Sequence, residues 1–240
     1  MSVPRLILDL DGVIVDALAE CALVTWLGAY PAQPGRPISA QPPPPGFTRH
    51  FAAVRAYART LGHFLVTHRS EPGGIAGRAD FDRAFAAIPE ADVAAFVAAA
   101  TAVRERCRTE EPGWWLGRHT LYPGLAALIR RHAGTVAVIT AKDAGSAWAI
   151  LRHHGLADAV TEVVGDCGRK DLAVAALCPD PAAVTFIDDS LANVAQVAAT
   201  GADARWATWG YHTPEDAAAA RAGGVHAIDL PHAAELTLVS

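Results

Sequence analysis

The run LILDLDG at residues 6–12 constrains the fold of this chain more than any other stretch. An apolar run that ends abruptly in two carboxylates is typical of a buried strand. Side chains two residues apart on a strand point the same way, so Asp9 and Asp11 can face one site while Leu10 turns into packing. Gly12 lets the backbone turn sharply or approach a ligand closely. Two ionised carboxylates in a partly dry crevice require a cation from elsewhere in the chain.

Composition narrows the class of protein. The 240 residues are 52% hydrophobic, which is ample for a substantial core. A net charge of -5 gives no support for nucleic acid or an anionic membrane surface as the main partner. No stretch approaches the roughly 18 consecutive apolar residues of a membrane span, and the N-terminus reaches charged residues too early for a secretory signal. We therefore expect a cytoplasmic protein with neither a nucleic-acid nor a membrane partner.

Beyond residue 122, short apolar runs alternate with helical patterns. The runs lie at residues 136–139, 159–164, 184–187, 204–208 and 225–228, and helices are predicted over 123–133, 144–154, 170–177 and 190–199. Continuous apolar strands that alternate with helices indicate a parallel sheet covered on both faces. The predicted fold class is therefore α/β, with a doubly wound, Rossmann-like parallel sheet.

Residues 16–118 have a different pattern, with helical spacing and no convincing strand. Helices are predicted over residues 16–26, 47–66, 80–88 and 91–107, and Asp16 is expected to cap the first of them. Residues 30–46 hold seven prolines, which predicts a loop of polyproline character or a disordered insertion. We predict a core of residues 1–15 and 119–240, interrupted by an all-helical insertion at residues 16–118.

Polar residues follow three of the apolar runs. Asp9 and Asp11 follow the first, Thr140 follows the second, and Asp188 and Asp189 follow a later one. Lys170 begins a predicted helix from which it can reach the same crevice, and it is one of only two lysines in the chain. Ligands of open parallel sheets bind at the carboxyl ends of the strands, so these groups predict one site. The other lysine, Lys142, is expected to be solvated or to lie at the entrance of the site, and it is the alternative to Lys170.

These residues resemble the four motifs of the haloacid dehalogenase superfamily. The matching features are D-x-D-G at residues 9–12, Thr140 after an apolar run, Lys170, and a hydrophobic strand ending in Asp188-Asp189-x-x-x-Asn193. The helical insertion is similar to the cap domain that this superfamily carries after its first motif. The chain departs from the common pattern at Ala141, where members often have Asn, and at Asn193, where they often have Asp.

The resemblance implies a division of labour at the site. Asp9 would be the nucleophile that forms an aspartyl-phosphate, and Asp11 would be the general acid and base. The hydroxyl of Thr140 and the amide of Ala141 would bind the phosphoryl oxygens, while Lys170 would offset the clustered carboxylates. The implied cofactor is Mg²⁺, bound by oxygen ligands from Asp9, the Asp11 carbonyl, Asp189 and Asp188.

The expected function is hydrolysis of a small phosphorylated organic substrate by a magnesium-dependent phosphatase. A dehalogenase is disfavoured because it lacks the second carboxylate that Asp11 supplies. A phosphonate-cleaving enzyme would use a lysine in the cap, and residues 16–118 contain none. A sugar phosphomutase of the same fold stays open, as does a non-catalytic phosphate-binding or regulatory homologue. The sequence leaves open whether the protein is a monomer or a homodimer.

Overall fold

The computed structural model describes residues 3–238 and divides into two compact units. The first, here called the core unit, comprises Met1–Asp16 and Thr120–Ser240. The second, here called the inserted unit, comprises Ala17–His119. The chain therefore leaves the core unit after Asp16 and returns to it at Thr120.

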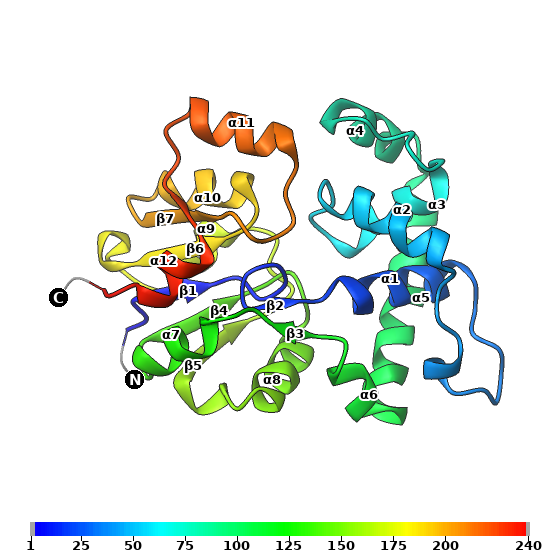
Figure 1. The fold of residues 1–240 in the computed structure, drawn as a ribbon, viewed down its shortest axis with the longest axis horizontal. Helices are drawn as coiled ribbons and strands as arrows, with labels where there is room; N and C mark the ends of the chain where they lie inside the picture. Colours follow the sequence, from blue (N-terminus) through cyan, green and yellow to red (C-terminus); the bar gives the residue numbers. More distant parts are fainter. Residues whose placement is uncertain (1–2, 239–240) are drawn as a thin grey trace. The chain divides into compact units, whose positions relative to one another are not determined.

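The core unit is built on a six-stranded sheet in the order β5-β4-β1-β6-β7-β8 (Figure 1). Every pairing within it is parallel. The strands are β1 (Leu6–Leu8), β4 (Val136–Ile139), β5 (Val160–Val164), β6 (Thr185–Asp188), β7 (Asp203–Ala207) and β8 (Ala227–Ile228). The doubly wound parallel sheet predicted from the apolar runs is confirmed.

The central strands are apolar because they are covered on both faces. All residues of β1 and β4 are fully buried, so their side chains contribute to packing on both sides of the sheet. One face forms a hydrophobic cluster in which Ile7 and Phe186 of the strands meet Val174 and Val194 of the helices. The first strand pairs with β4 on one side and β6 on the other, which places the end of β1 at the centre of the sheet's carboxyl edge.

Within residues 3–238, six helices of the core unit flank this sheet. They are α7 (Leu125–Arg131), α8 (Ala144–His153), α9 (Lys170–Leu177), α10 (Leu191–Ala198), α11 (Pro214–Ala222) and α12 (Leu230–Glu235). Short 3-10 turns precede β5 and β6, at Ala157–Ala159 and Pro181–Ala183. The last two helices were absent from the sequence-based prediction, although Thr213 and Asp216 form a capping box at the start of α11.

A two-stranded antiparallel ribbon carries the chain out of the core unit and back. It pairs β2 (Val15–Asp16) with β3 (Thr120–Leu121), so that Asp16 lies opposite Thr120. The prediction that Asp16 caps the first helix is wrong. That helix has Ala17 at its N-cap and no side-chain cap, because Asp16 belongs to the ribbon and accepts a hydrogen bond from Tyr211 instead.

The inserted unit consists of helices and has no strand among its residues, all of which the structure describes. The helices are α1 (Leu18–Ala29), α2 (Pro45–Arg55), α3 (Val66–Arg69), α4 (Arg78–Ala86), α5 (Glu90–Glu110) and α6 (Pro112–Leu116). The single helix predicted over residues 47–66 is broken, because α2 ends at Arg55 and a 3-10 turn, Leu61–Leu65, follows. Phe51, Phe64 and Phe81 are buried in the core of this unit.

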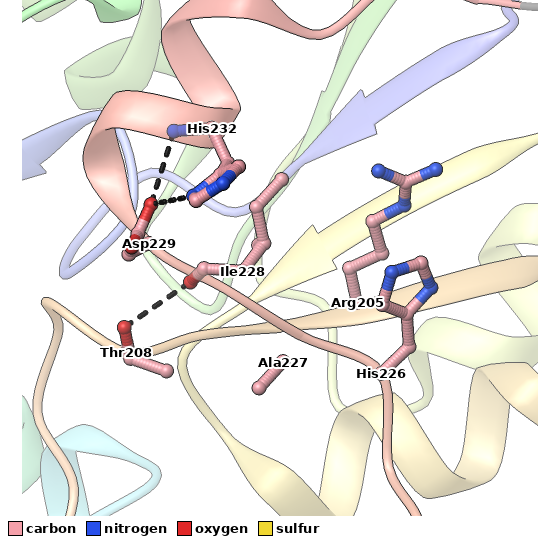
Figure 2. A pocket seen from close by; sticks show the side chains of 7 residues that line it. All are labelled: Arg205, Thr208, His226, Ala227, Ile228, Asp229 and His232. Atoms are coloured by element: carbon pink, nitrogen blue, oxygen red, sulfur yellow. Dashed lines mark hydrogen bonds and ion pairs between the residues drawn. The ribbon is translucent and has the colours of Figure 1, made fainter.

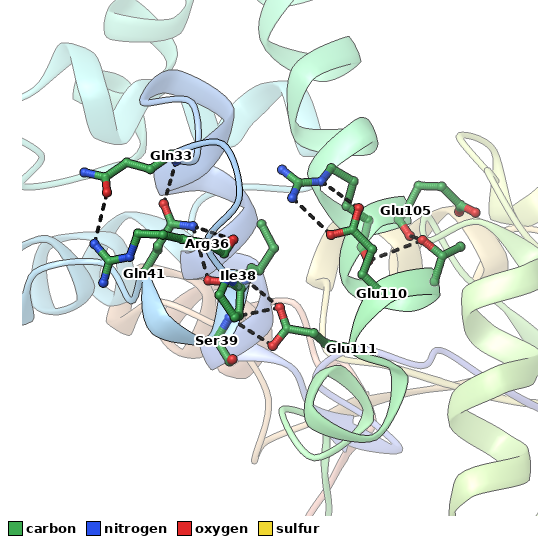
Figure 3. Close-up of polar contacts among 11 residues, drawn as sticks. Gln33, Arg36, Ile38, Ser39, Gln41, Glu105, Glu110 and Glu111 are labelled. Carbon is green, nitrogen blue, oxygen red and sulfur yellow. Dashed lines mark hydrogen bonds and ion pairs between the residues drawn. The ribbon is translucent and has the colours of Figure 1, made fainter.

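The proline-rich segment at residues 30–46 is held by specific hydrogen bonds (Figure 3). It contains a 3-10 turn, Ile38–Ala40, whose Ile38 side chain is fully buried. The Ile38 and Ser39 amides both donate to the Glu111 carboxylate at the end of α5. Gln41 accepts from the Gln33 amide at 2.6 Å and so closes the loop. The expectation of an irregular polyproline segment is therefore only partly met.

Among the described helices, no single one is long and apolar enough to cross a membrane. The helices α4 and α5 reach the required length and composition only as a pair, with a bend of 99° between them.

Candidate active site

Three carboxylates gather at the carboxyl edge of the sheet. Asp9 follows β1, Asp188 ends β6, and Asp189 comes next in the chain. The register of these parallel strands places Leu8 beside Ile187, and the Asp9 amide donates to the Ile187 carbonyl at 3.0 Å. One oxygen from each carboxylate lies within 4.8 Å of the others. The sheet topology thus brings Asp9, Asp188 and Asp189 into one cluster that could hold a cation.

Lys170 lies inside this cluster. Its Nζ is 2.8 Å from Asp9 Oδ1 and 2.8 Å from Asp188 Oδ2, and it donates to the Ile139 carbonyl at 2.8 Å. An ammonium group has three hydrogens, and these three contacts account for all of them. The side chain is 4% exposed, and burial alone would lower its pKa, yet Asp188 and Asp9 more than offset that effect and raise it. Lys170 is therefore a buried, charged residue.

The charge balance of the cluster is incomplete. One ammonium faces three carboxylates, which leaves two formal negative charges when all the carboxylates are ionised. The pKa of Asp9 is raised from its ordinary 3.8 to about 7, first by burial and then by Asp188 and Asp189, with Lys170 opposing the rise. A divalent cation would offset the two uncompensated negative charges, and carboxylate oxygens are ligands that Mg²⁺ prefers.

Asp188 is held from several sides. The Ser190 amide donates to its Oδ1 at 2.7 Å, and Asn193 donates through Nδ2 to its Oδ2 at 3.0 Å. The departure from the family pattern at Asn193 has a local explanation, because a carboxylate there could not donate this hydrogen bond and would repel Asp188. Asp188 is fully buried, and its bonds fix its orientation.

A second ion pair lies beside the first. Lys142 Nζ is 3.1 Å from Asp11 Oδ2, and the Lys142 side chain is 2% exposed. The expectation that Lys142 is solvated is wrong, because its ammonium group is buried against Asp11. Within the described residues, Asp11 Oδ1 is buried and has no hydrogen-bond partner. An unpartnered buried carboxylate oxygen is costly, so this atom is a candidate for contact with a bound ligand.

Thr140 and Ala141 lie at the carboxyl end of β4. Thr140 is 2% exposed, and its Oγ1 accepts a hydrogen bond from the Lys142 amide at 3.1 Å. Thr140 does not cap α8, since Asp143 does so by accepting from the Ser146 amide at 2.8 Å. The hydroxyl hydrogen of Thr140 can therefore be directed to a ligand. Ala141 is exposed.

Trp206 of β7 and Tyr211, which follows that strand, make contacts that the sequence-based prediction missed. The Trp206 indole donates to the Asp189 carbonyl at 2.9 Å, and the Tyr211 amide donates to Asp189 Oδ2 at 2.6 Å. The same reasoning from strand ends would have found Tyr211, because the segment W-G-Y at residues 209–211 directly follows an apolar run.

A pocket of about 460 Å³ lies at the β8 edge of the same unit, apart from these carboxylates (Figure 2). Its charged groups are paired within the protein. Arg205 donates to Asp203 at 2.7 Å, and His232 contacts Asp229 at 2.6 Å. Since its charged groups are already paired, this pocket is a weaker candidate for a cation site than the carboxylate cluster.

His68 and the pair Trp114 and Trp115 lie in the inserted unit. His68 contacts the rings of Trp26 and Phe47, and its Nε2 is 2.9 Å from the Thr25 carbonyl. Trp115 is fully buried, while the neighbouring Trp114 contacts Arg118. These contacts are those of packing residues within the unit.

Comparisons with known proteins show the family of the chain. The model of the haloacid dehalogenase-like hydrolase family matches residues 4–201. No curated protein sequence gives a significant match.

Solved structures resemble the chain over most of its length. A protein provisionally assigned as a phosphoglycolate phosphatase from Lactobacillus delbrueckii has a TM-score of 0.62 at 16% identity, covering 98% of this chain and 96% of that one. A predicted phosphoglycolate phosphatase from Haemophilus somnus has a TM-score of 0.55 at 18% identity, covering 88% and 87%. A haloacid dehalogenase-like family hydrolase from Streptococcus pneumoniae has a TM-score of 0.57 at 15% identity, covering 95% and 94%. At these sequence identities, the similarity to the three structures shows the fold alone.

Proposed function

Since the chain belongs to the haloacid dehalogenase-like hydrolase family, we propose that it is a magnesium-dependent phosphatase that hydrolyses a small organic phosphomonoester. The observation that carries the proposal is the separation of two carboxylates by their cationic partners. Asp9 contacts Lys170, whereas Asp11 contacts Lys142. Different partners allow the two groups to hold different protonation states, as a nucleophile and an acid/base must.

Asp9 is the proposed nucleophile. Its Oδ1 is held by Lys170 and by the Leu10 amide, each at 2.8 Å, which fixes the orientation of the carboxylate. In the first step a carboxylate oxygen of Asp9 bonds to phosphorus, and the bond from phosphorus to the substrate's alcohol oxygen breaks. In the second step water attacks the same phosphorus, which releases phosphate and restores Asp9.

Asp11 is the proposed acid and base. In the first step it gives a proton to the leaving alcohol oxygen, and in the second it takes a proton from the attacking water. Its Oδ1 has no hydrogen-bond partner within the described part of the chain, which suits an atom that must exchange a proton with substrate and water. Lys142 holds the other oxygen in place.

The donor set fits Mg²⁺. The three clustered carboxylates supply hard oxygen ligands, and their two uncompensated charges match a divalent cation. We propose that Asp9, Asp189 and the Asp11 carbonyl hold the ion, with Asp188 as a further ligand or a charge that tunes the site. When bound, Mg²⁺ would polarise the phosphoryl oxygens and offset their charge.

The remaining residues bind the phosphoryl group and balance charge. The Thr140 hydroxyl and the Ala141 amide are the proposed donors to the phosphoryl oxygens. Lys170 directs its three contacts to protein oxygens, so its proposed contribution is to hold Asp9 and to neutralise the cluster rather than to bind substrate.

The inserted unit is the proposed cap, and its residues would select the substrate. Two of the structures that the chain resembles are described as phosphoglycolate phosphatases, which makes phosphoglycolate the first specific substrate to test. A cytoplasmic location stays a prediction.

The test is phosphate release by the purified full chain. Enzyme stripped of metal with EDTA is assayed on an aryl phosphate and on a panel of small phosphomonoesters that includes phosphoglycolate, with and without added Mg²⁺. The proposal expects turnover that requires Mg²⁺ and is lost in Asp9→Asn. Phosphate transfer between positions of a sugar phosphate, without net release, would indicate the mutase instead. No turnover on any member of the panel would contradict the proposal.

A further inference from the structure

We propose that Tyr211 is a positioning residue for the metal ligand Asp189, joining it to the ribbon through which the chain leaves the core unit. The inference rests on the proposed function, in which Asp189 binds Mg²⁺. Tyr211 itself contacts neither the metal nor the substrate in this account. It acts by fixing the position of the Asp189 carboxylate relative to the other proposed metal ligands.

Tyr211 contacts the proposed metal ligand Asp189 directly. The Tyr211 amide donates to Asp189 Oδ2 at 2.6 Å, which fixes one of the two carboxylate oxygens. The Trp206 indole donates to the Asp189 carbonyl at 2.9 Å and so fixes the backbone of the same residue. Outer hydrogen bonds of this kind orient metal ligands and influence metal affinity.

Close packing around Asp189 shows how little room it has to move. A Cβ at position 210 would lie 2.3 Å from Asp189 Cβ and 2.5 Å from the Gly12 carbonyl oxygen. A Cβ at position 12 would lie 2.2 Å from Asp189 Oδ2 and 3.0 Å from Cδ2 of Tyr211. The Tyr211 ring therefore lies beside the turn that follows Asp9 and Asp11. Only glycine at these two positions permits the approach.

The phenol end of the Tyr211 side chain contacts the ribbon that leads out of the core unit. Its hydroxyl donates to Asp16 Oδ1 at 2.6 Å. Asp16 is the last residue of the core unit before the chain enters the inserted unit, and it pairs with Thr120 across the ribbon. Trp209 adds a parallel connection, because its indole donates to the Val13 carbonyl at 3.1 Å.

Tyr211 thus connects two features that are far apart in the sequence. Its amide donates a hydrogen bond to the proposed metal ligand Asp189, and its hydroxyl donates one to Asp16 at the end of β2, just before the inserted unit. Loss of the hydroxyl leaves the hydrogen bond from the Tyr211 amide to Asp189 possible. It removes the hydrogen bond to Asp16 that fixes the position of Tyr211. The consequence expected is a poorly positioned Asp189 and weaker Mg²⁺ binding, without loss of the fold.

The experiment measures Mg²⁺ binding by isothermal titration calorimetry on the EDTA-treated full chain. Tyr211→Phe is expected to raise the Mg²⁺ dissociation constant by about tenfold, the lower end of the 10–100-fold effect typical of outer-sphere partners. Asp16→Asn keeps an oxygen that accepts from the hydroxyl, so it should bind Mg²⁺ like the wild type. Asp16→Ala should match Tyr211→Phe. The matched control is Tyr30→Phe, which removes the hydroxyl of an exposed tyrosine in the inserted unit.

A double variant separates a specific connection from general damage. If Tyr211 and Asp16 act through one bond, Tyr211→Phe combined with Asp16→Ala should bind no more weakly than either single variant. Thermal melting without metal should be nearly the same for all the variants, with the difference appearing only when Mg²⁺ is added.

Two outcomes would overturn the inference, and they differ in what else they affect. Wild-type protein that binds no Mg²⁺ would overturn the proposed metal site and this inference with it. Wild-type protein that binds Mg²⁺, with unchanged affinity in Tyr211→Phe or fully additive losses in the double variant, would overturn the role of Tyr211 alone.

Discussion

Lys142 Nζ lies 3.1 Å from Asp11 Oδ2 in a buried ion pair that sits beside the Lys170 cluster. Both lysines of the chain are therefore used at one site, each against a different carboxylate of the D-x-D motif. A compact ammonium group fits such a space where a planar guanidinium would not, and the remaining cations of the chain are arginines.

Replacement of Lys142 should lower the free energy of unfolding. Lys142→Met leaves the Asp11 carboxylate without this partner, and breaking a buried ion pair costs about 3–5 kcal/mol. Because Asp11 is 15% exposed, we expect the lower end of that range in the free energy of unfolding, measured by urea denaturation. Combining Lys142→Met with Asp11→Asn should recover part of the loss. Full additivity of the two changes would contradict a direct pair.

The pKa of Asp9 predicts how the metal-free protein responds to pH. Since the pKa rises from 3.8 in the unfolded chain to about 7 in the folded one, the folded state binds the proton more tightly. The stabilisation from this group is therefore complete at low pH and is lost as the pH rises through about 7. Urea denaturation of EDTA-treated protein between pH 4 and pH 8.5 should show this fall between the unfolded pKa of 3.8 and the folded pKa of about 7, as an excess over Asp9→Asn measured in parallel, with no further change above it.

The same pKa predicts competition between Mg²⁺ and the proton. Binding of the cation requires ionised Asp9, so the Mg²⁺ dissociation constant should rise as the pH falls below about 7 and level off above it. Calorimetry in buffers of different ionisation enthalpy should detect proton release on the acidic side. Proton release that is equal at all pH values would contradict this assignment.

Gly210 should tolerate no side chain. Gly210→Ala places a Cβ 2.3 Å from Asp189 Cβ, and crowding of this kind costs about 1–3 kcal/mol. We expect a lower melting temperature and weaker Mg²⁺ binding in calorimetry. The matched control is Gly46→Ala, since a Cβ at that position meets nothing within 4 Å. Equal behaviour of the two variants would argue against close packing at Asp189.

Glu111 should stabilise the proline-rich loop. Its carboxylate accepts from the Ile38 and Ser39 amides, and a hydrogen bond to a charged group contributes about 1.5–3 kcal/mol. Glu111→Ala should therefore speed cleavage within residues 30–46 in limited proteolysis. Glu110→Ala is the control, because Glu110 forms an exposed ion pair with Arg106, and pairs of that kind contribute little. Similar cleavage rates in both variants would contradict the role of Glu111.

The sequence predicts the sheet well because a short run of consecutive apolar residues is enough to indicate each buried strand. Strands such as β1 and β4 are apolar throughout, and the polar residues that follow them mark the carboxyl edge. Since the carboxyl ends of parallel strands lie at the same edge of a sheet, the sequence alone predicts that Asp9, Thr140 and Asp188 lie near one another.

What the sequence did not predict depends on contacts between distant segments. Nothing near Lys142 in the sequence indicates that it is buried, since its partner Asp11 comes from the turn that follows β1. The same holds for Asp16, whose neighbours suggest a helix cap while Tyr211 draws it into a different hydrogen bond. The break in the helix predicted at residues 47–66 has a similar origin, because helical spacing of apolar residues does not show where a chain turns.

The most direct test of the central claim is to trap the phosphorylated enzyme. The full chain is mixed with Mg²⁺ and an aryl phosphate, quenched in acid during turnover, digested, and examined by mass spectrometry. The account predicts one phosphoryl group on Asp9 and none in Asp9→Asn, which should also release no phosphate. A phosphoryl group on another residue, or phosphate release that survives in Asp9→Asn, would contradict it.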